Sequence, residues 1–335
     1  MTRERPPRLP GLDAVKGVGI LLVVLIHAAP EAREGYDRHF VNGVARLAVP
    51  AFLLVTGFLS GIKQSGPDKL AGYFRTFLRL HLVYGLFYWG VSLLRNGLPD
   101  SLTAKSVVLH FGVASYAGQF YLAILVQLFL VAAFLLPARF WERGSAVLLA
   151  AAAAVAGIGW LYLLFGLPDL AAGLPDPLPV LLGFQSGIWL WLYYFALGGW
   201  LGHRARTGGG VAPAWTPLLL GAALLLAALD LPTLPGWEED LALRPYTRPS
   251  ILLASTLLAF ALPALARRDA PGPLRRLGVE SFGVFVLNPA LLLALSDLLG
   301  RPATLGSSWL YVAAAVAAAV PLTRLARRWL PFMVP

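Results

Sequence analysis

The sequence predicts an all-α protein, a polytopic integral membrane helical bundle of about ten transmembrane helices with both termini in the cytoplasm. Of its 335 residues, 58% are apolar and 13% are charged, whereas an average soluble domain carries about 25% charged residues. A soluble fold cannot hide so much apolar surface, because its exterior must stay polar. Apolar stretches also recur along the chain between breaks rich in glycine, proline and charge. They lack the alternation of a strand, which favours helices over a membrane barrel.

The predicted spans follow one another at short intervals. Crossing the hydrocarbon core takes about 20 helical residues. The first span begins like a signal peptide, but its long apolar run and the spans behind it favour a retained helix. The stretch 188–202 is short and reaches full length only if the preceding loop dips into the membrane. In order, the spans are expected at residues 12–30, 40–62, 80–95, 119–136, 146–166, 188–202, 214–230, 250–266, 282–299 and 307–323.

Charge supports this topology. We expect one membrane domain over residues 1–335, with a cytoplasmic N-terminal segment at 1–11 and a cytoplasmic tail at 324–335. The net charge is +10, and the segments placed in the cytoplasm hold most of the 27 basic residues, as the positive-inside rule requires. The charge therefore indicates the inner face of a cell membrane and its lipids, not nucleic acid. The chain has no cysteine, which excludes thiolate catalysis and cysteine-ligated metals, and no metal site is predicted.

The first span carries the strongest candidate for chemistry. His27 is predicted deep in this span, and an ionisable residue at membrane depth is by default a functional candidate. Lys16 lies eleven residues earlier, about 20° away around the helix and roughly 16 Å along it. Asp13 lies three residues before Lys16 and can pair with it. A ligand with an anionic head and a reactive end one to two nanometres away, such as acyl-coenzyme A, fits this face. The alternatives are a neutral structural histidine and a charge pair that only marks the membrane boundary.

A second basic feature follows in the next cytoplasmic segment. Arg75 and Arg79 are four residues apart, hence on one helix face, and aromatic residues separate them. Such a pair can bind phosphates bidentately. The alternative is ordinary anchoring to lipid head groups by the positive-inside rule.

Several segments then resemble a known family, the membrane acyltransferases of the acyltransferase-three type, which O-acylate carbohydrates. The first span resembles the first helix of that family, with an Asp, a basic residue and a later His. The other matches run in the same order over nearly the whole chain, so together they are fairly specific although each alone is weak. The matching segments read LDAVKGVGILLVVLIH, VPAFLLVTGFLSG, YFRTFLRLH, QFYLAILVQLFL, LYYFALGGWLG and LGVESFGVFVLNP.

The chain also departs from the family pattern. Thr56 and Gly57 replace a Ser-Gly pair. The family's R-x-x-R would fall on Thr76 and Arg79, so the first arginine is displaced to Arg75. Asn288 stands where the family has a late histidine, and an amide can form hydrogen bonds but cannot take up a proton.

The resemblance implies transfer of an acyl group, most often acetyl, from cytoplasmic acyl-coenzyme A to a hydroxyl of an extracytoplasmic or lipid-linked carbohydrate. In this hypothesis Lys16, Arg75 and Arg79 hold the coenzyme phosphates and His27 is the general base at the thioester. Asp13, which can pair with Lys16, is the other residue of the first span assigned to catalysis. Acetyl-coenzyme A is the expected co-substrate, without a metal. Polar residues expected to bind substrate or stabilise the oxyanion are Thr56, Tyr121, Gln127, Ser281 and Asn288.

Other functions stay open at this point. A transporter or flippase would also place polar residues in its helices, and the displaced arginine and missing histidine are compatible with a family member that lacks catalysis. A lipid-linked glycosyltransferase would use acidic residues in the first outer loop, where Glu31, Glu34 and Asp37 lie. A structural scaffold would leave His27 unexplained.

Overall fold

The structure, a computed structural model, describes residues 9–29, 35–96, 120–135, 144–164, 188–209, 213–229, 246 and 248–333. Within these ranges the regular structure is helical throughout, and short 3₁₀ turns lie at Val44–Leu47, Pro213–Trp215 and Pro331–Met333. The α-helices are α1 (Pro10–Ala28), α2 (Gly35–Asn42), α3 (Ala48–Lys63), α4 (Pro67–Asn96), α6 (Phe120–Leu135), α8 (Ser145–Leu164), α11 (Ile188–Arg206), α12 (Thr216–Leu229), α13 (Pro249–Ala266), α14 (Gly272–Leu299) and α15 (Leu305–Trp329).

The chain is a multi-pass membrane protein. Six of the described helical stretches are long and apolar enough to cross a bilayer, and α6, α8 and α12 contain shorter apolar segments. Each predicted span overlaps a described helix, and the span predicted at 40–62 covers the end of α2, the 3₁₀ turn after it and most of α3. Two helices begin well before their predicted spans: α4 begins at Pro67 instead of residue 80, and α14 begins at Gly272 instead of 282. Charged residues in their first turns lower the local hydropathy, so the apolar pattern alone misses these turns.

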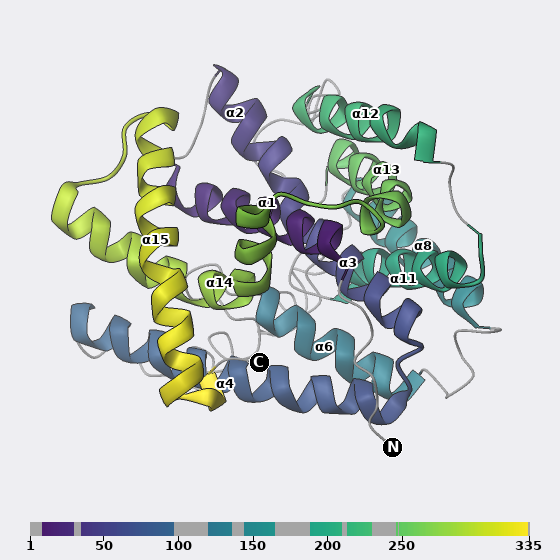
Figure 1. The fold of residues 1–335 in the computed structure, drawn as a ribbon, viewed down its shortest axis with the longest axis horizontal. Helices are drawn as coiled ribbons and strands as arrows, with labels where there is room; N and C mark the ends of the chain where they lie inside the picture. Colours follow the sequence, from purple (N-terminus) through teal and green to yellow (C-terminus); the bar gives the residue numbers. More distant parts are fainter. Residues whose placement is uncertain are drawn as a thin grey trace.

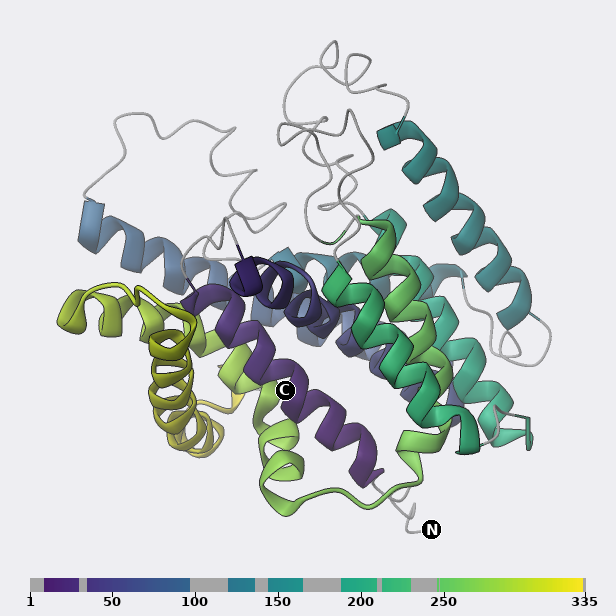
Figure 2. The same ribbon diagram turned by 90° about the horizontal axis from the view of Figure 1, so that it is seen from above.

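Helices α1 and α3 form the centre of the bundle (Figures 1 and 2). α1 packs mainly on α14, and α3 packs mainly on α11. The outer pairs are α4 with α6, α12 with α13, and α14 with α15. α1 and α3 also pack on each other, and α6 contacts α11. The largest buried cluster of apolar side chains joins these helices, and it includes Ile20, Phe58, Phe129 and Trp191.

Glycines bring the central helices together. On α3, a Cβ added at Gly57 or Gly61 would collide with the backbone of α11. On α11, a Cβ added at Gly198 or Gly202 would collide with the backbone of α3. Each helix therefore presents a G-x-x-x-G pair to the other, the small-residue pattern that lets membrane helices approach closely. The same kind of contact joins α1 to α14, where Gly278 lies against the Asp13 carbonyl.

Candidate functional site

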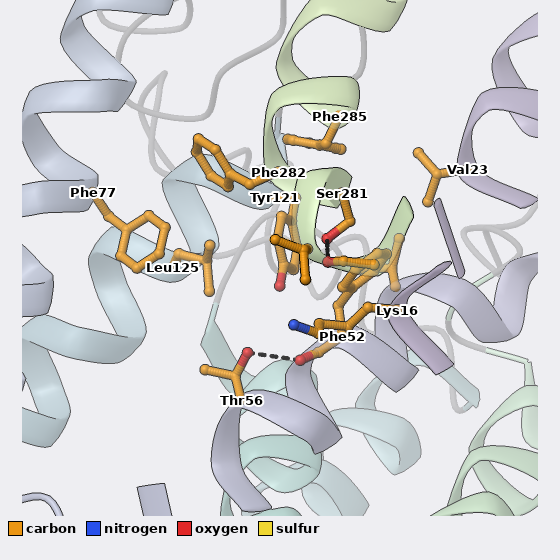
Figure 3. A pocket seen from close by; sticks show the side chains of 13 residues that line it. Lys16, Val23, Phe52, Thr56, Phe77, Tyr121, Leu125, Ser281, Phe282 and Phe285 are labelled. Atoms are coloured by element: carbon orange, nitrogen blue, oxygen red, sulfur yellow. Dashed lines mark hydrogen bonds between the residues drawn. The ribbon is translucent and has the colours of Figure 1, made fainter. Parts of the chain in front are cut away.

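A cavity of about 220 Å³ lies between α1, α3, α4, α6 and α14. Lys16 and Val23 line it from α1, and Val49, Phe52 and Thr56 line it from α3. The remaining wall comes from α4, α6 and α14, whose lining residues include Phe77, Tyr121, Leu125, Ser281, Phe282 and Phe285. Figure 3 shows aromatic side chains around most of this space and a few polar atoms pointing into it. Such a mostly apolar cavity with a few convergent polar groups is typical of a small-molecule site.

Four of the predicted site residues meet in this cavity: Lys16, Thr56, Tyr121 and Ser281. The hydroxyl groups of Thr56, Tyr121 and Ser281 differ in the hydrogen bonds that they can form with a ligand. Thr56 Oγ1 donates to the Phe52 carbonyl at 2.7 Å, and Ser281 Oγ donates to the Gly278 carbonyl at 2.8 Å. Both hydroxyl hydrogens are therefore engaged with their own helices, as is common for Ser and Thr inside helices. The Tyr121 hydroxyl and the Lys16 ammonium point into the cavity (Figure 3); the tyrosine hydroxyl is hydrogen-bonded to Thr56, and the ammonium can donate to a ligand.

The predicted pair of Lys16 and Asp13 is confirmed. Lys16 Nζ lies 2.7 Å from Asp13 Oδ1, and the two side chains are 24% and 13% exposed. Asp13 holds the ammonium on the face of α1 that lines the cavity. Lys16 lines the cavity near the N-terminal end of α1, where the backbones of α1 and α14 are in contact.

His27 lies near the end of α1 and not at its middle. It is in the last turn of the helix, one residue before its end, and its side chain is exposed among the described residues. The helix ends at Ala28 because the chain turns to extended backbone at Ala29. Val23, one turn earlier, lines the cavity. His27 therefore lies one turn beyond the cavity, and its ring forms no hydrogen bond with the residues that the structure describes.

Arg75 and Arg79 do not reach the cavity. Both side chains are exposed, whereas Phe77, between them on α4, lines the cavity and stacks on Phe129 at 5.3 Å. Residues two positions apart on a helix point about 200° apart. The two arginines therefore point away from the cavity that Phe77 faces, contrary to the expectation that they join Lys16.

Gln127 is also absent from the cavity wall. It is half-buried on α6, two residues beyond the lining residue Leu125, and so faces another direction. Two of the acidic residues of the glycosyltransferase alternative, Glu31 and Glu34, lie outside the described residues. No group of three or more potential metal ligands occurs in the part of the chain that the structure describes.

Asn288 is fully buried on α14, one turn beyond the cavity-lining Phe285. Pro289 follows it inside the helix and has no N–H to donate to the Phe285 carbonyl, four residues earlier. Asn288 Nδ2 donates to that carbonyl at 2.5 Å instead. On α4, the Tyr88 hydroxyl donates to the neighbouring Val286 carbonyl at 2.7 Å. The amide therefore has a structural role in the interrupted helix.

Sequence reasoning did not select Lys63 as a site residue. Lys63 is exposed at the end of α3, seven residues after the cavity-lining Thr56 and hence on the same helix face. Lys16 and Lys69 lie within electrostatic range of its ammonium. The face spacing of Val49, Phe52, Thr56 and Lys63 was the signal in the sequence that could have found it. Lys16, Lys63 and Lys69 are therefore close enough to interact electrostatically, and of these three lysines only Lys16 lines the cavity.

A sequence model of the family described as an acyltransferase domain matches residues 9–327. The match covers nearly all of the chain and every helix that contributes to the cavity. No curated protein and no solved structure shows a significant match.

Proposed function

The chain belongs to the acyltransferase 3 family, and from this premise we propose that it moves an acyl group from cytoplasmic acyl-coenzyme A to a carbohydrate hydroxyl on the outer side of the membrane. The acceptor is an extracytoplasmic or lipid-linked glycan, and acetyl-coenzyme A is the proposed donor. The observation that supports the proposal is the cavity, whose wall on α1 runs from Lys16, the lysine next to Lys63 and Lys69, to Val23, one turn before His27.

The proposed topology places both termini and the three lysines in the cytoplasm, with ten helices crossing the membrane. Lys16, Lys63 and Lys69 then bind the phosphates of the donor. No described residue forms an ion pair with Lys63 or Lys69, so their charge is available to an anion. Because Arg75 and Arg79 face away from the cavity, we assign them to lipid head groups of the inner leaflet instead.

The pantetheine arm of the donor would occupy the aromatic cavity and bring the thioester toward Val23 and the last turn of α1. His27 takes the proton of the acceptor hydroxyl, and the acceptor oxygen bonds to the acyl carbon. The carbon–sulfur bond then breaks, and the departing thiolate takes the proton from the imidazolium. A histidine suits this step because its ordinary pKa lies near working pH.

The oxyanion that forms at the acyl carbonyl needs a donor in a water-poor site. The Lys16 ammonium can supply one, and the Tyr121 hydroxyl can do so when it turns from Thr56, to which it is hydrogen-bonded. Thr56 and Ser281 can still accept hydrogen bonds from the pantetheine amides, since each hydroxyl oxygen keeps a free lone pair.

The test uses purified protein in lipid vesicles with acetyl-coenzyme A labelled in the acetyl group. We expect the wild type to bind the donor and to transfer label to carbohydrate in a membrane extract. A His27→Ala variant should bind the donor equally well but transfer label about 10²- to 10⁴-fold more slowly, the usual contribution of a general base.

Two results would contradict the proposal. Wild-type transfer rates in His27→Ala would remove the base. Failure of acetyl-, succinyl- and longer acyl-coenzyme A to bind the wild type would remove the donor, and the transporter hypothesis would then take its place.

A further inference from the structure

A second cation lies at the other end of the cavity. Arg46, in the 3₁₀ turn before α3, is half-buried. Arg46 lies three residues before Val49 in the chain, and His27 lies four residues after Val23. Both valines line the cavity. The 3₁₀ turn that carries Arg46 packs against α1, and the guanidinium is within electrostatic range of the His27 ring. Arg46 and His27 therefore lie together just past the end of the cavity opposite the three lysines.

Neighbouring side chains hold the guanidinium of Arg46 in place but do not neutralise its positive charge. Its carbon lies 5.2 Å from the centre of the Tyr246 ring. Nη1 donates to the Tyr246 hydroxyl and Nη2 to Asn42 Oδ1, both at the long distance of 3.4 Å. Tyr246 is itself held in a ring cluster with Phe120 and Trp191.

Arg46 lacks the acidic partner that several other cations of the bundle have. Arg95 pairs with Asp297 at 2.8 Å, and Arg327 pairs with Glu280 at 2.7 Å. No described acidic residue pairs with Arg46, and its buried Nε has no hydrogen-bond partner among the described residues. A partly buried guanidinium without a counter-ion is costly, and its planar fork matches a carboxylate or phosphate.

We propose that Arg46 binds an anionic group on the acceptor, so that the carbohydrate acylated here is an acidic one carrying a carboxylate or a phosphate. The anion would lie on the Nε side of the guanidinium while Tyr246 supports its face. The acceptor hydroxyl is thereby held beside His27. This inference rests on the proposed function, because it names the acceptor class of the same site.

The experiment measures how sugars protect His27 from diethyl pyrocarbonate, with modification followed by mass spectrometry, and it requires no acyl transfer. The probes are glucuronate, glucose 1-phosphate and, as the neutral comparison, glucose. In the wild type the acidic sugars should slow modification of His27 and glucose should not. Comparing the two acidic sugars distinguishes carboxylate from phosphate recognition. His39, which is hydrogen-bonded to the Ala228 carbonyl at 2.9 Å, serves as the internal reference.

In Arg46→Gln, the concentration of acidic sugar needed for half protection should rise about tenfold or more, as expected when an anion loses a charged donor. Arg46→Lys keeps the charge and should retain part of the protection. Arg95→Gln is the matched control, because that arginine already has a carboxylate partner, and it should behave as the wild type.

Three results would overturn the inference: equal protection by glucose, unchanged protection in Arg46→Gln, or no protection by either acidic sugar in the wild type. A fold defect in Arg46→Gln would show as altered modification of His39. None of these results depends on acetyl-coenzyme A, so the inference can fail while the proposed acyl transfer stands.

Discussion

At the residue scale, Asn288 departs from the family pattern, and the structure gives a physical reason for an amide at this position. As a sequence feature it is a missing histidine. In the structure its amide supplies the hydrogen bond that Pro289 cannot give to the Phe285 carbonyl. The side chain is fully buried, and an unmet buried carbonyl costs about 1–3 kcal/mol. Asn288 therefore supports the wall that holds Ser281 and Phe285 in the cavity.

This role predicts that the effect of replacing Asn288 on stability depends on whether residue 289 is a proline. Asn288→Ala should lower the free energy of unfolding by about 1–3 kcal/mol, because the Phe285 carbonyl loses its donor. In the Pro289→Ala background the same change should cost much less, since residue 289 regains an N–H that can donate to Phe285. Thermal unfolding of the four proteins in detergent completes the cycle. Strictly additive effects of the two substitutions would show that the amide and the proline do not act on one carbonyl.

At the element scale, the close contact of α3 with α11 positions Thr56 and Lys63 relative to the cavity. Gly57→Ala should destabilise the protein by about 1–3 kcal/mol, because the added methyl group must force two packed helices apart. Gly90→Ala on α4 is the matched control, since a Cβ there meets nothing within 4 Å. Replacing a helical glycine by alanine without a clash is neutral or stabilising. Thermal unfolding measures both, and equal melting temperatures would argue against the tight interface.

The three lysines predict which substitutions weaken donor binding. Lys63→Gln should weaken binding of acetyl-coenzyme A about tenfold or more, because a charge-assisted bond to phosphate is lost. Arg75→Gln and Arg79→Gln should leave binding near the wild-type value, since these side chains point away from the cavity. Equilibrium binding to purified protein in lipid nanodiscs gives the comparison. A large loss in Arg75→Gln with none in Lys63→Gln would restore the assignment made from sequence.

At the scale of the whole molecule, apolar content and the distribution of charge were enough to predict an all-helical membrane protein, and every predicted span overlaps a helix. Residue types at helical spacing also brought out Lys16 with Asp13. The sequence could not show which way the side chains of α4 face, because aromatic residues occur on both sides of Arg75 and Arg79. It did not show that His27 lies one residue before the end of α1, because an apolar stretch does not reveal where a helix ends. Lys63 was missed because its face became apparent only with the cavity.

The two ends of the cavity imply a sidedness that can be measured directly, and the cysteine-free chain needs no background substitutions for the purpose. Asp269, between α13 and α14, and Arg301, between α14 and α15, are both exposed. With the three lysines in the cytoplasm, α14 must carry the chain outward between them. In intact cells, a membrane-impermeant maleimide should therefore label Arg301→Cys and spare Asp269→Cys, and lysis should make both reactive. If both label in intact cells, α14 does not cross the membrane. If only Asp269→Cys labels, the lysines face outward and cannot bind a cytoplasmic donor.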